Sequence, residues 1–388
     1  MSFKLLIVVD HISKDVKVGT WEFAYKFGKY ASAMIDVTIV TFKPDNMREV
    51  PDYEVEGNLK IYRFKNGRLF LPAIKKIDHD IAFVHTVKSF AVYRISMGLK
   101  KKPIVSMIHG TSYLERLINS RGKDLKYYAL RLFEIYRIAA SDILFFASKY
   151  MMFNSVLNFA AFRKSTYLPL AVDYPEKKPT VPEKEKYIKN MIEDDIKKGY
   201  RIIFCVRRIV ARTGVLNLVD MMKSIENQKV KLYIAGSGPF IGELREKVLN
   251  SGLSDKIVVL GLISDEAKFW IYSKSYLSIV PTLALEGFCL SMLESMNYGC
   301  PSVVTPVGGM YEFMVDRGLR ELVSINASPA QIAQVVNTLL NDKKLRDTLA
   351  EKCMDIARRH YYPEIVKSFL QEIFYMLEKR NFLINFDN

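Results

Sequence analysis

The sequence predicts an α/β protein of two Rossmann-like halves, and three observations support this prediction. The chain has 388 residues, which is long for one hydrophobic core and favours two domains. Short apolar runs alternate with segments of helical periodicity in both halves, as in the βαβ units of doubly wound sheets. Between the halves, residues 174–187 are rich in Pro, Lys and Glu, lack periodicity and are expected to belong to a linker.

In the first half, short and largely apolar runs are expected to be parallel strands buried on both faces. They are Lys4–Val9, Val37–Thr41, Ile81–Val84, Pro103–Met107, Ile143–Ala147 and Tyr167–Leu170. A helix from about Trp21 to Ser32 follows the loop that contains Gly19. Gly19 stands where a strand gives way to a helix, so its backbone can approach a phosphate, although a plain turn is an equal alternative.

Two histidines follow predicted strands, at the edge where α/β folds place their ligands. For a single histidine, a structural role is usually the better interpretation; the family resemblance given below ranks His109, which Gly110 and Thr111 follow, above His85. Asp78-His79-Asp80 has the spacing of a metal-binding Asp-x-Asp, but it leads directly into a predicted strand. We therefore interpret it as structural and expect no metal ion.

Residues 113–140 are predicted to be a long helical region with an apolar stripe. The stripe consists of Leu125, Tyr128, Leu132, Ile135 and Ala139, and the charges come from Arg116, Arg121, Lys123, Lys126, Arg131 and Arg137. The preferred interpretation is a helix that faces the core with its stripe and water with its basic face. Attachment to anionic lipid, helped by the aromatic residues, is the alternative.

In the second half, the strands expected from apolar runs are Arg201–Val206, Lys231–Ala235, Ile257–Leu260, Leu277–Val280, Ser302–Thr305 and the LVSI run at 322–325. Helices are expected over 329–359 and, as one long final helix, from Tyr362 to about Arg380. The Gly236-Ser-Gly238 turn after the second of these strands is weak evidence for a ligand site by itself.

The stretch from Ile279 to Met310 is the candidate working centre. It reads as a strand end, a turn, a helix over about Leu290–Tyr298 and another strand. Glu286 precedes the helix and Glu294 follows eight residues later. The amides between them are the unpaired donors of a helix N-terminus, which suits an anion. Taken alone, two solvated glutamates on an ordinary helix would remain the better interpretation.

Composition narrows the class of protein. Hydrophobic residues make up 49% and charged residues 26%, as in a soluble globular protein, and no apolar run is long enough to span a membrane. The first ten residues are too short and end too acidic for a signal peptide. The four cysteines, at 205, 289, 300 and 353, show no metal-ligand spacing, so we expect a cytoplasmic protein.

The net charge of +15 is concentrated in the first half. Residues 1–172 contain 27 Lys and Arg against 15 Asp and Glu, a net charge of +12, whereas the remainder carries only +3. This favours an anionic partner for the first half. A membrane surface, a polyanionic acceptor and nucleic acid are the alternatives.

The stretch at the candidate centre resembles the signature of retaining glycosyltransferases of family 4, which have the GT-B fold. The resemblance is carried by Glu286-Gly-Phe-x-Leu, the second glutamate at 294, Gly-x-Pro-x-Val after the helix and a Gly-Gly loop. It implies that Glu286 and the amides of Gly287, Phe288, Cys289 and Leu290 hold the donor sugar and phosphate. Glu294 would bind the ribose hydroxyls. The sequence departs from the pattern at Cys289, where Gly is usual, and at Ser291, where Pro is usual.

The resemblance also assigns residues outside this stretch. In the family an Arg, and a Lys five residues later, grip the donor diphosphate; Arg208 matches the Arg, whereas Thr213 replaces the Lys. Arg212, or Arg207 where Gly is usual, is expected to substitute for that Lys, because departing diphosphate needs cations when no metal is present. The remaining implied contacts are His109 at the reacting sugar, Gly19, Gly236 and Gly238 near the donor, and backbone near Leu262 and Ile263 at the base.

The implied architecture is two Rossmann-like domains facing a cleft. We expect an acceptor domain over residues 1–172, a linker over 173–199, a nucleotide-sugar domain over 200–360, and residues 361–388 as a helix that crosses back to the first domain. The implied reaction is metal-independent hexosyl transfer, with retention, from a nucleotide-diphosphate-sugar to a sugar, lipid-linked or protein acceptor. The basic first half favours a membrane-proximal acceptor, and with it peripheral attachment to the inner face of the membrane.

Three rival functions stay open. The first is a nucleotide-sugar-binding protein without transferase activity, which Thr213, Cys289 and the single Gly19 keep plausible. The second is a nucleic-acid-binding protein that uses the basic half, but it gives Glu286 and Glu294 no role. An epimerase of the same fold fits the motif less well.

Overall fold

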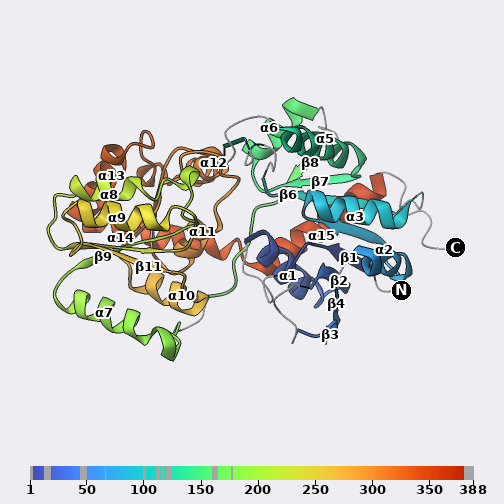
Figure 1. Cartoon of the computed structure of the whole chain (residues 1–388), viewed down its shortest axis with the longest axis horizontal. Helices are drawn as coiled ribbons and strands as arrows, with labels where there is room; N and C mark the ends of the chain where they lie inside the picture. Colours follow the sequence, from blue (N-terminus) through green and yellow to red (C-terminus); the bar gives the residue numbers. More distant parts are fainter. Residues whose placement is uncertain are drawn as a thin grey trace. The chain divides into compact units, whose positions relative to one another are not determined.

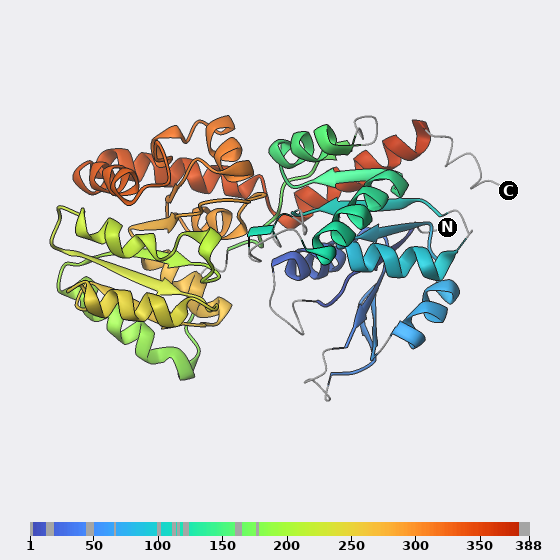
Figure 2. The ribbon, with the colours of Figure 1, turned by 45° about the horizontal axis from the view of Figure 1, so that its top comes forward.

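The computed structural model describes residues 3–12, 19–43, 50–65, 67–98, 102–110, 114, 117–118, 124–159, 165–175 and 178–379. The chain divides into two compact units (Figures 1 and 2). Unit 1 contains Met1–Ala171 together with Tyr361–Asn388, and unit 2 contains Val172–His360. The C-terminal helix therefore belongs to the first unit, as predicted.

Unit 1 is built on an eight-stranded sheet with the order β3-β4-β2-β1-β5-β6-β7-β8. The strands are β1 (Lys4–Val8), β2 (Asp36–Phe42), β3 (Tyr53–Glu56), β4 (Leu59–Phe64), β5 (Ile81–Val84), β6 (Ile104–Ile108), β7 (Ile143–Phe146) and β8 (Ser165–Tyr167). Every pair is parallel except β3 with β4, an antiparallel hairpin whose turn contains Gly57 at φ +62°. The strand periodicity did not predict this hairpin.

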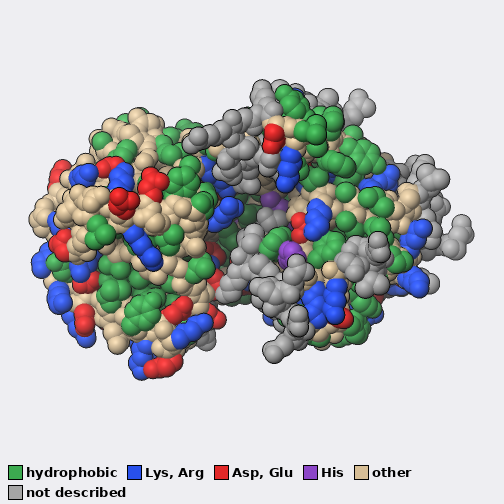
Figure 3. Space-filling model, in the orientation of Figure 1, with side chains coloured by type: hydrophobic (Ala, Val, Ile, Leu, Met, Phe, Trp, Pro, Cys, Tyr) green, Lys and Arg blue, Asp and Glu red, His purple; other side chains and the backbone are tan. Residues whose placement is uncertain are grey.

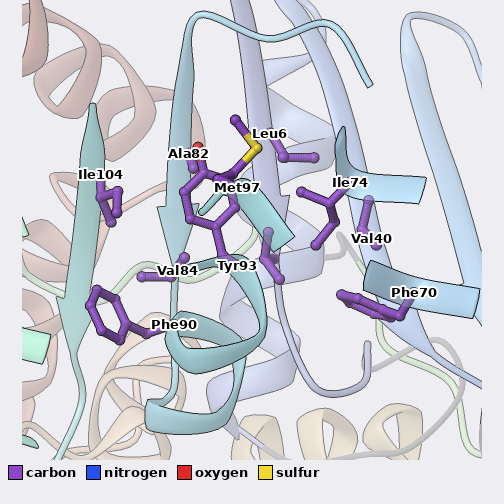
Figure 4. Packing of buried hydrophobic residues seen from close by; sticks show 11 residues of the cluster. Leu6, Val40, Phe70, Ile74, Ala82, Val84, Phe90, Tyr93, Met97 and Ile104 are labelled. Carbon is purple, nitrogen blue, oxygen red and sulfur yellow. The ribbon is translucent and has the colours of Figure 1, made fainter. Parts of the chain in front are cut away.

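Helices cover both faces of this sheet (Figure 2). They are α1 (Gly19–Ala31), α2 (Gly67–Lys76), α3 (Val87–Met97), α5 (Leu125–Ala140), α6 (Lys149–Phe159) and α15 (Tyr362–Lys379). Because successive strand residues point to opposite faces, Ala82 and Val84 pack with Phe90 of α3 in one core, shown in Figure 4. Phe83 faces the other way, against Phe27 of α1 and Phe369 of α15. This alternation explains why the buried strands read as continuous apolar runs.

The final helix, α15, packs along α1. The rings of Tyr30 and Tyr362 stack with centroids 5.3 Å apart, and Phe27 meets Phe369 edge to face at 4.6 Å. Phe3 contacts Phe374 in the same way at 5.0 Å. These aromatic contacts, each favourable beyond simple area burial, hold the end of the chain on the unit in which the chain begins.

The prediction that the stripe of α5 faces the core is wrong. Leu125 is 87% exposed, Leu132 is 66% exposed, and Tyr128 is about half exposed. The buried residues are Tyr127, Glu134, Arg137 and Ile138, which lie on the opposite side of the helix. A stripe of apolar residues reveals that a helix has two faces but not which one meets water. Arg116, Arg121 and Lys123 of the same predicted region lie outside the described residues.

Unit 2 is built on a five-stranded parallel sheet with the order β11-β10-β9-β12-β13. The strands are β9 (Arg201–Val206), β10 (Val230–Ala235), β11 (Ile257–Gly261), β12 (Leu277–Val280) and β13 (Ser302–Val304). The strand expected at 322–325 reduces to a single bridge between Val304 and Val323. A 3₁₀ turn, Arg320–Leu322, takes up the preceding residues and leaves no length for a ladder.

The helices of unit 2 are α7 (Lys186–Lys197), α8 (Asn217–Lys223), α9 (Ile241–Asn250), α10 (Asp265–Lys274), α11 (Leu290–Asn297), α12 (Gly308–Asp316), α13 (Pro329–Asn341) and α14 (Lys343–Arg358). Short 3₁₀ turns occupy Glu183–Glu185 and Ala211–Thr213. Helix α7 lies within the segment expected as linker, and its Ile188 and Ile192 are buried in a core with Trp270 of α10. The Tyr233 hydroxyl, on the sheet, donates to Asp195 of α7 at 2.5 Å. Before α7, Val181 also packs against this core.

The parallel α/β fold predicted from the sequence is thus confirmed in both units. Among the described residues, no helix is both long and apolar enough to cross a membrane. The four cysteines are buried and unpaired with one another.

Candidate functional site

The carboxyl edge of the unit 2 sheet brings together loops that lie far apart in the sequence. Arg207 follows β9, Gly236 follows β10, Glu286 lies in the loop after β12, and Gly308 begins α12 after β13. In a parallel sheet these strand ends share one edge, which is where α/β folds place their ligands.

Arg207 is the centre of this edge. Arg207 Nη2 pairs with Glu286 Oε2 and also donates to the Thr282 hydroxyl at 3.1 Å. Both side chains of the Arg207–Glu286 pair are only 12% exposed. Burial lowers the pKa of the Arg207 guanidinium, but the charge and hydrogen bond of Glu286, together with the nearby Cys289 and Cys205, outweigh this effect, so the net pKa is raised. Arg207 is therefore charged at every physiological pH. The sequence named it only as a substitute cation.

Cys289 contacts the same guanidinium. Arg207 Nη1 donates to the Cys289 sulfur at 3.1 Å, and the Ser291 hydroxyl lies 3.3 Å from that sulfur. Cys289 has φ +79°, and Leu285 in the same loop has φ +54°. Left-handed backbone of this kind costs roughly 1 kcal/mol or more for a residue with a Cβ. The cysteine thus occupies a position that the backbone suits to glycine, and strained residues of this type cluster at functional sites.

Gly236 and Gly238 let the loops after β9 and β10 pack directly on each other. A Cβ on Gly236 would lie 1.9 Å from the Arg207 carbonyl oxygen, and one on Gly238 would lie 2.2 Å from that of Ile209. The Arg207 amide donates to Ala235 at 3.1 Å and the Ile209 amide donates to Ser237 at 2.9 Å. In the structure the two glycines therefore fix the backbone from which Arg207 projects.

The Gly-Gly loop after β13 supports Glu286 in the same way. A Cβ on Gly308 would lie 2.1 Å from the Glu286 carbonyl oxygen, which accepts a hydrogen bond from the Gly309 amide at 2.9 Å. The Thr305 hydroxyl donates to the Thr282 carbonyl at 2.5 Å. The sequence pattern contained these glycines but did not identify their role as a backbone support.

Thr213 does not replace the expected lysine as a ligand group. Its hydroxyl is buried and lies 2.7 Å from the carbonyl oxygens of both Arg208 and Val210, so it closes its own loop. Arg208 is exposed, and Arg212 is half-buried with Nη1 donating to the Leu285 carbonyl at 3.3 Å. The two arginines remain the candidates for binding a phosphate, because a guanidinium matches phosphate oxygens well.

Glu294 lies on α11 and is 6% exposed. Its Oε1 accepts from the ammonium of Lys268 on α10 at 2.8 Å, and the same ammonium lies 3.1 Å from Asp265. Sequence reasoning missed Lys268, although its place in the first turn after the helix cap Ser264 put it close to the expected base site. A buried carboxylate with a buried cation keeps its charge and can still accept hydroxyl hydrogen bonds.

The remaining predicted residues of unit 2 surround this edge. Phe288 is buried against Phe313, with ring centroids 5.0 Å apart, while Gly287 and Leu290 carry backbone amides at the start of α11. Ile263 packs on the core beside α10, and the neighbouring Ser264 amide donates to Glu185 at 2.9 Å. Helix α11 thus begins between the two glutamates, as its sequence predicted.

The carboxyl edge of the unit 1 sheet holds histidines instead of ion pairs. His85 Nδ1 lies 3.1 Å from His109 Nε2, so one ring donates a hydrogen bond to the other. Burial, reinforced by the charge of Arg137, lowers the pKa of His109 to about 3, and burial likewise lowers that of His85. Both rings are therefore neutral at pH 7. His85, ranked low from the sequence, is the direct partner of the preferred candidate.

Asp10 and Thr86 complete this edge. The Thr86 hydroxyl, which caps α3, donates to Asp10 at 2.9 Å, and burial raises the pKa of Asp10. Gly19 is the first residue of α1, and the loop before it lies outside the described residues.

Among the residues that the structure describes, no three His, Cys, Asp or Glu side chains are grouped to hold a metal ion. Asp78 pairs with the Lys4 ammonium at 2.5 Å, and Asp80 accepts from the Lys4 amide at 2.8 Å. This acidic motif therefore anchors the start of β1.

Comparison with known proteins extends these observations. Residues 187–354 match the family model described as glycosyl transferases group 1. An uncharacterized glycosyltransferase of Methanocaldococcus jannaschii is 28% identical over 178 residues, 45% of this chain but only 44% of that protein. The match thus spans less than half of that relative. A second uncharacterized glycosyltransferase of the same organism is 23% identical over 90% of this chain and 88% of its own length.

Solved structures show the same fold. Sucrose-phosphate synthase from Thermosynechococcus elongatus superposes with a TM-score of 0.78 at 18% identity, covering 98% of this chain and 100% of its own. The Anabaena protein HepE in complex with UDP-glucose superposes with a TM-score of 0.74 at 17% identity, covering 95% and 99%. The chain therefore has the α/β fold of GT-B glycosyltransferases, and residues 187–354 resemble the group 1 glycosyltransferases in sequence.

Proposed function

We propose that this protein transfers a sugar, with retention of configuration, from a nucleotide-diphosphate-sugar to an acceptor and without a metal ion. The observation that carries the proposal is the carboxyl edge of unit 2. There, two carboxylates, each held by a buried cation, flank the N-terminus of α11. The similarity of residues 187–354 to glycosyl transferases group 1, and the UDP-glucose in the complex of HepE, support a nucleotide-sugar as the donor.

Each part of the donor has a chemically suitable group at this edge. Glu294 would accept hydrogen bonds from the ribose hydroxyls, and Glu286 from hydroxyls of the sugar. The amides of residues 287–290 and the guanidinium groups of Arg208 and Arg212 would hold the diphosphate. Fixed cations and amide dipoles would stabilise the negative charge that develops as the diphosphate leaves, which is the role that a metal ion has elsewhere.

In a single-step reaction, retention needs the acceptor to attack from the face that the diphosphate leaves. The bond from the anomeric carbon to the phosphate oxygen breaks, the bond to the acceptor oxygen forms on the same face, and the acceptor proton passes to the departing phosphate. Unit 1 would contribute His109 next to the reacting sugar. Because His109 is neutral and its Nε2 meets His85, it would contact the sugar through Nδ1.

A metal-free assay tests the reaction. Purified protein would be incubated with a panel of nucleotide-sugars in chelator, and product anomers would be assigned by NMR, with Glu286→Gln alongside. We expect one donor to release its nucleoside diphosphate, with the α or β configuration of the donor preserved, and a rate at least about tenfold lower in the variant. Binding of a donor without any release, with acceptor extracts present, would favour the inactive binding protein. Inversion of configuration would contradict the proposed mechanism.

The acceptor is proposed to be lipid-linked or membrane-proximal. The α5 surface, which we define as Leu125, Tyr128, Leu132, Phe133 and Tyr136, is exposed on unit 1. Figure 3 shows hydrophobic side chains gathered over α5. The exposed cations Lys126 and Arg131 flank these residues on the same helix, in the half that carries the net charge of +12. An apolar face bordered by cations suits the interface of an anionic bilayer.

Vesicle flotation tests this surface. We expect the protein to float with vesicles of equal parts phosphatidylcholine and phosphatidylglycerol, and to be released by salt, because exposed charges are screened. A Leu125→Glu, Leu132→Glu double variant should lose most of the bound fraction. Leu249→Glu, on α9 of unit 2, changes an equally exposed leucine and is the matched control. Equal flotation of all three proteins would exclude the α5 surface as the contact.

A further inference from the structure

Two positions where the resembling family usually has glycine carry side chains here, and those side chains touch. Arg207 and Cys289 are 82 residues apart in the sequence, yet Arg207 Nη1 donates to the Cys289 sulfur at 3.1 Å. Both side chains lie at the edge proposed to bind the donor. Two departures that meet at one contact are better explained as one change of the site than as two unrelated substitutions.

Arg207 also restricts how Glu286 can be used. Every hydrogen bond that the structure gives to the Glu286 carboxylate, within the described residues, ends on Oε2: one from Arg207 and one from Thr282 at 3.3 Å. Oε1 is therefore the oxygen that can accept from a ligand. An adjacent pair of hydroxyls binds a carboxylate best when each hydroxyl meets its own oxygen, so the occupation of Oε2 by Arg207 and Thr282 favours a single hydroxyl at Oε1.

The pair is locked in place on several sides. Arg207 is fixed by Glu286, Thr282 and Cys289, and the loop behind it allows no Cβ at Gly236. Arg207 Nε is buried without a hydrogen-bond partner, so the position of this side chain depends on the contacts of its two Nη atoms. Separating the ions would leave a buried charge uncompensated, so Glu286 does not swing away to bind a ligand. Cys289 places a side chain at a position with left-handed backbone, and this side chain narrows the space beside Arg207 and Glu286.

We propose that Arg207 and Cys289 together determine the sugar specificity of the donor site. Arg207 is a positioning residue that presents Glu286 through Oε1 alone, and Cys289 holds Arg207 and reduces the space for the sugar. The site then takes a donor with a neutral sugar that offers one hydroxyl to Glu286, and rejects sugars with a bulky substituent there. The inference rests on the proposed function, because it names the sugar-selecting part of the same site.

Four variants test this proposal: Arg207→Gly, Cys289→Gly, the double Gly variant and Arg207→Lys. Calorimetry would measure the affinity of each for the nucleoside diphosphate alone and for a panel of nucleotide-sugars that includes N-acetylated and acidic sugars. The sugar's contribution is the ratio of the affinity for the nucleotide-sugar to the affinity for the nucleoside diphosphate. For the wild-type donor, Arg207→Gly should lower this ratio by at least about tenfold, and Arg207→Lys should recover part of it. Affinity for the sugar-free diphosphate should change by less than about threefold.

The double variant gives the sharpest readout. Glycine at both positions should allow larger donors to bind that the wild type rejects. The change in nucleotide-sugar affinity in the double variant should differ by at least about fivefold from the change expected by combining the two single variants, because residues in contact are energetically coupled. A sugar preference unchanged in all four variants would overturn the inference. A uniform loss of affinity for all ligands, diphosphate included, would show a structural role only. Failure of the wild type to bind any nucleotide-sugar would instead refute the proposed function. If the glycine variants unfold, Arg207→Lys and Cys289→Ser carry the same comparison.

Discussion

The carboxyl edges of the two sheets share a topology but differ in chemistry. In unit 2 the edge carries buried ion pairs, Arg207 with Glu286 and Lys268 with Glu294. In unit 1 the corresponding edge carries the His85–His109 pair, both rings neutral at pH 7. The backbone differs as well: a Cβ on Gly236 would collide with Arg207, whereas one on Gly110 would meet nothing within 4 Å.

This difference shows how one fold supports two tasks. Fixed charges on closely packed loops suit a ligand that is itself charged and must be held in one geometry. Neutral imidazoles suit contact with an uncharged group, because they can donate or accept a hydrogen bond without a counter-ion. The edges thus agree with a proposed division between a charged donor and a neutral reacting group, and the following predictions test that division.

Breaking an ion pair of unit 2 should have the largest effect. Glu286→Ala leaves the Arg207 guanidinium buried without its partner, so we expect the free energy of unfolding of unit 2 to fall by about 3–5 kcal/mol. Trp21 lies in unit 1 and Trp270 in unit 2, so a Trp21→Phe background makes tryptophan fluorescence report unit 2 alone. Glu243→Ala, at an exposed site on α9, should cost less than about 0.5 kcal/mol. Equal effects of the two changes would mean that the pair is not buried.

The difference in loop packing predicts the next effect. Gly236 has φ +129°, and a Cβ there would lie 1.9 Å from the Arg207 carbonyl oxygen. Gly236→Ala should therefore destabilise unit 2 by about 3 kcal/mol through overpacking and backbone strain. Gly110→Ala, at the unit 1 edge, should change stability by less than about 0.5 kcal/mol. Urea unfolding of both variants checks this, and tolerance of both changes would contradict the close loop contact.

The neutral histidines predict a pH dependence in unit 1. The pKa of His109 is about 3 when folded and about 6.5 when unfolded, so the unfolded chain binds more protons between these values. The stability that neutral His109 contributes to the folded state is complete above pH 6.5 and is lost as the pH falls toward 3. For His109 this amounts to about 2 kcal/mol between pH 7 and pH 5. Urea unfolding of a Trp270→Phe background, read through Trp21, should show a weaker pH dependence after His109→Gln. An unchanged slope would mean that His109 is not held neutral.

The smallest effect is expected at Thr213. Thr213→Val keeps the shape but removes the hydroxyl from the Arg208 and Val210 carbonyls, and should cost about 1 kcal/mol of unit 2 stability. Because that hydroxyl faces its own loop, nucleoside diphosphate affinity should change by less than about threefold. Thr213→Ser, which keeps the hydroxyl, is the control. A tenfold loss of affinity in the valine variant would place Thr213 in contact with the phosphate.

Sequence periodicity predicted most of the strands, because buried parallel strands are short, apolar and separated by helical segments. The predicted Ile81–Val84 agrees with β5 residue for residue, and the predicted Lys4–Val9 exceeds β1 by one residue. The β3–β4 hairpin was missed because neither strand carries a continuous apolar run: β3 is short and largely exposed, and in β4 the buried Leu59 and Ile61 alternate with polar or less buried residues. The face of α5 was assigned wrongly because a stripe does not say what covers it.

The sequence predicted several residues of the candidate site but not the contacts between them. The sequence named Glu286, Glu294 and Arg208 because a local pattern contains them. It did not pair Arg207 with Glu286, or Lys268 with Glu294, because each pair joins two loops or helices whose distance depends on the whole sheet. It placed Thr213 at the position of the family's lysine, but it did not show that the Thr213 hydroxyl hydrogen-bonds backward to its own loop.

The most direct test of the central claim is calorimetric titration of Glu286→Gln and Glu294→Gln with a nucleoside diphosphate and with its nucleotide-sugar, in chelator. If unit 2 binds the donor as proposed, Glu294→Gln should weaken both ligands equally, by about tenfold or more, because the ribose is common to them. Glu286→Gln should weaken only the nucleotide-sugar, because it meets the sugar. Equal weakening of both ligands by both variants, or of neither, would contradict the assignment of the two carboxylates to two parts of one donor.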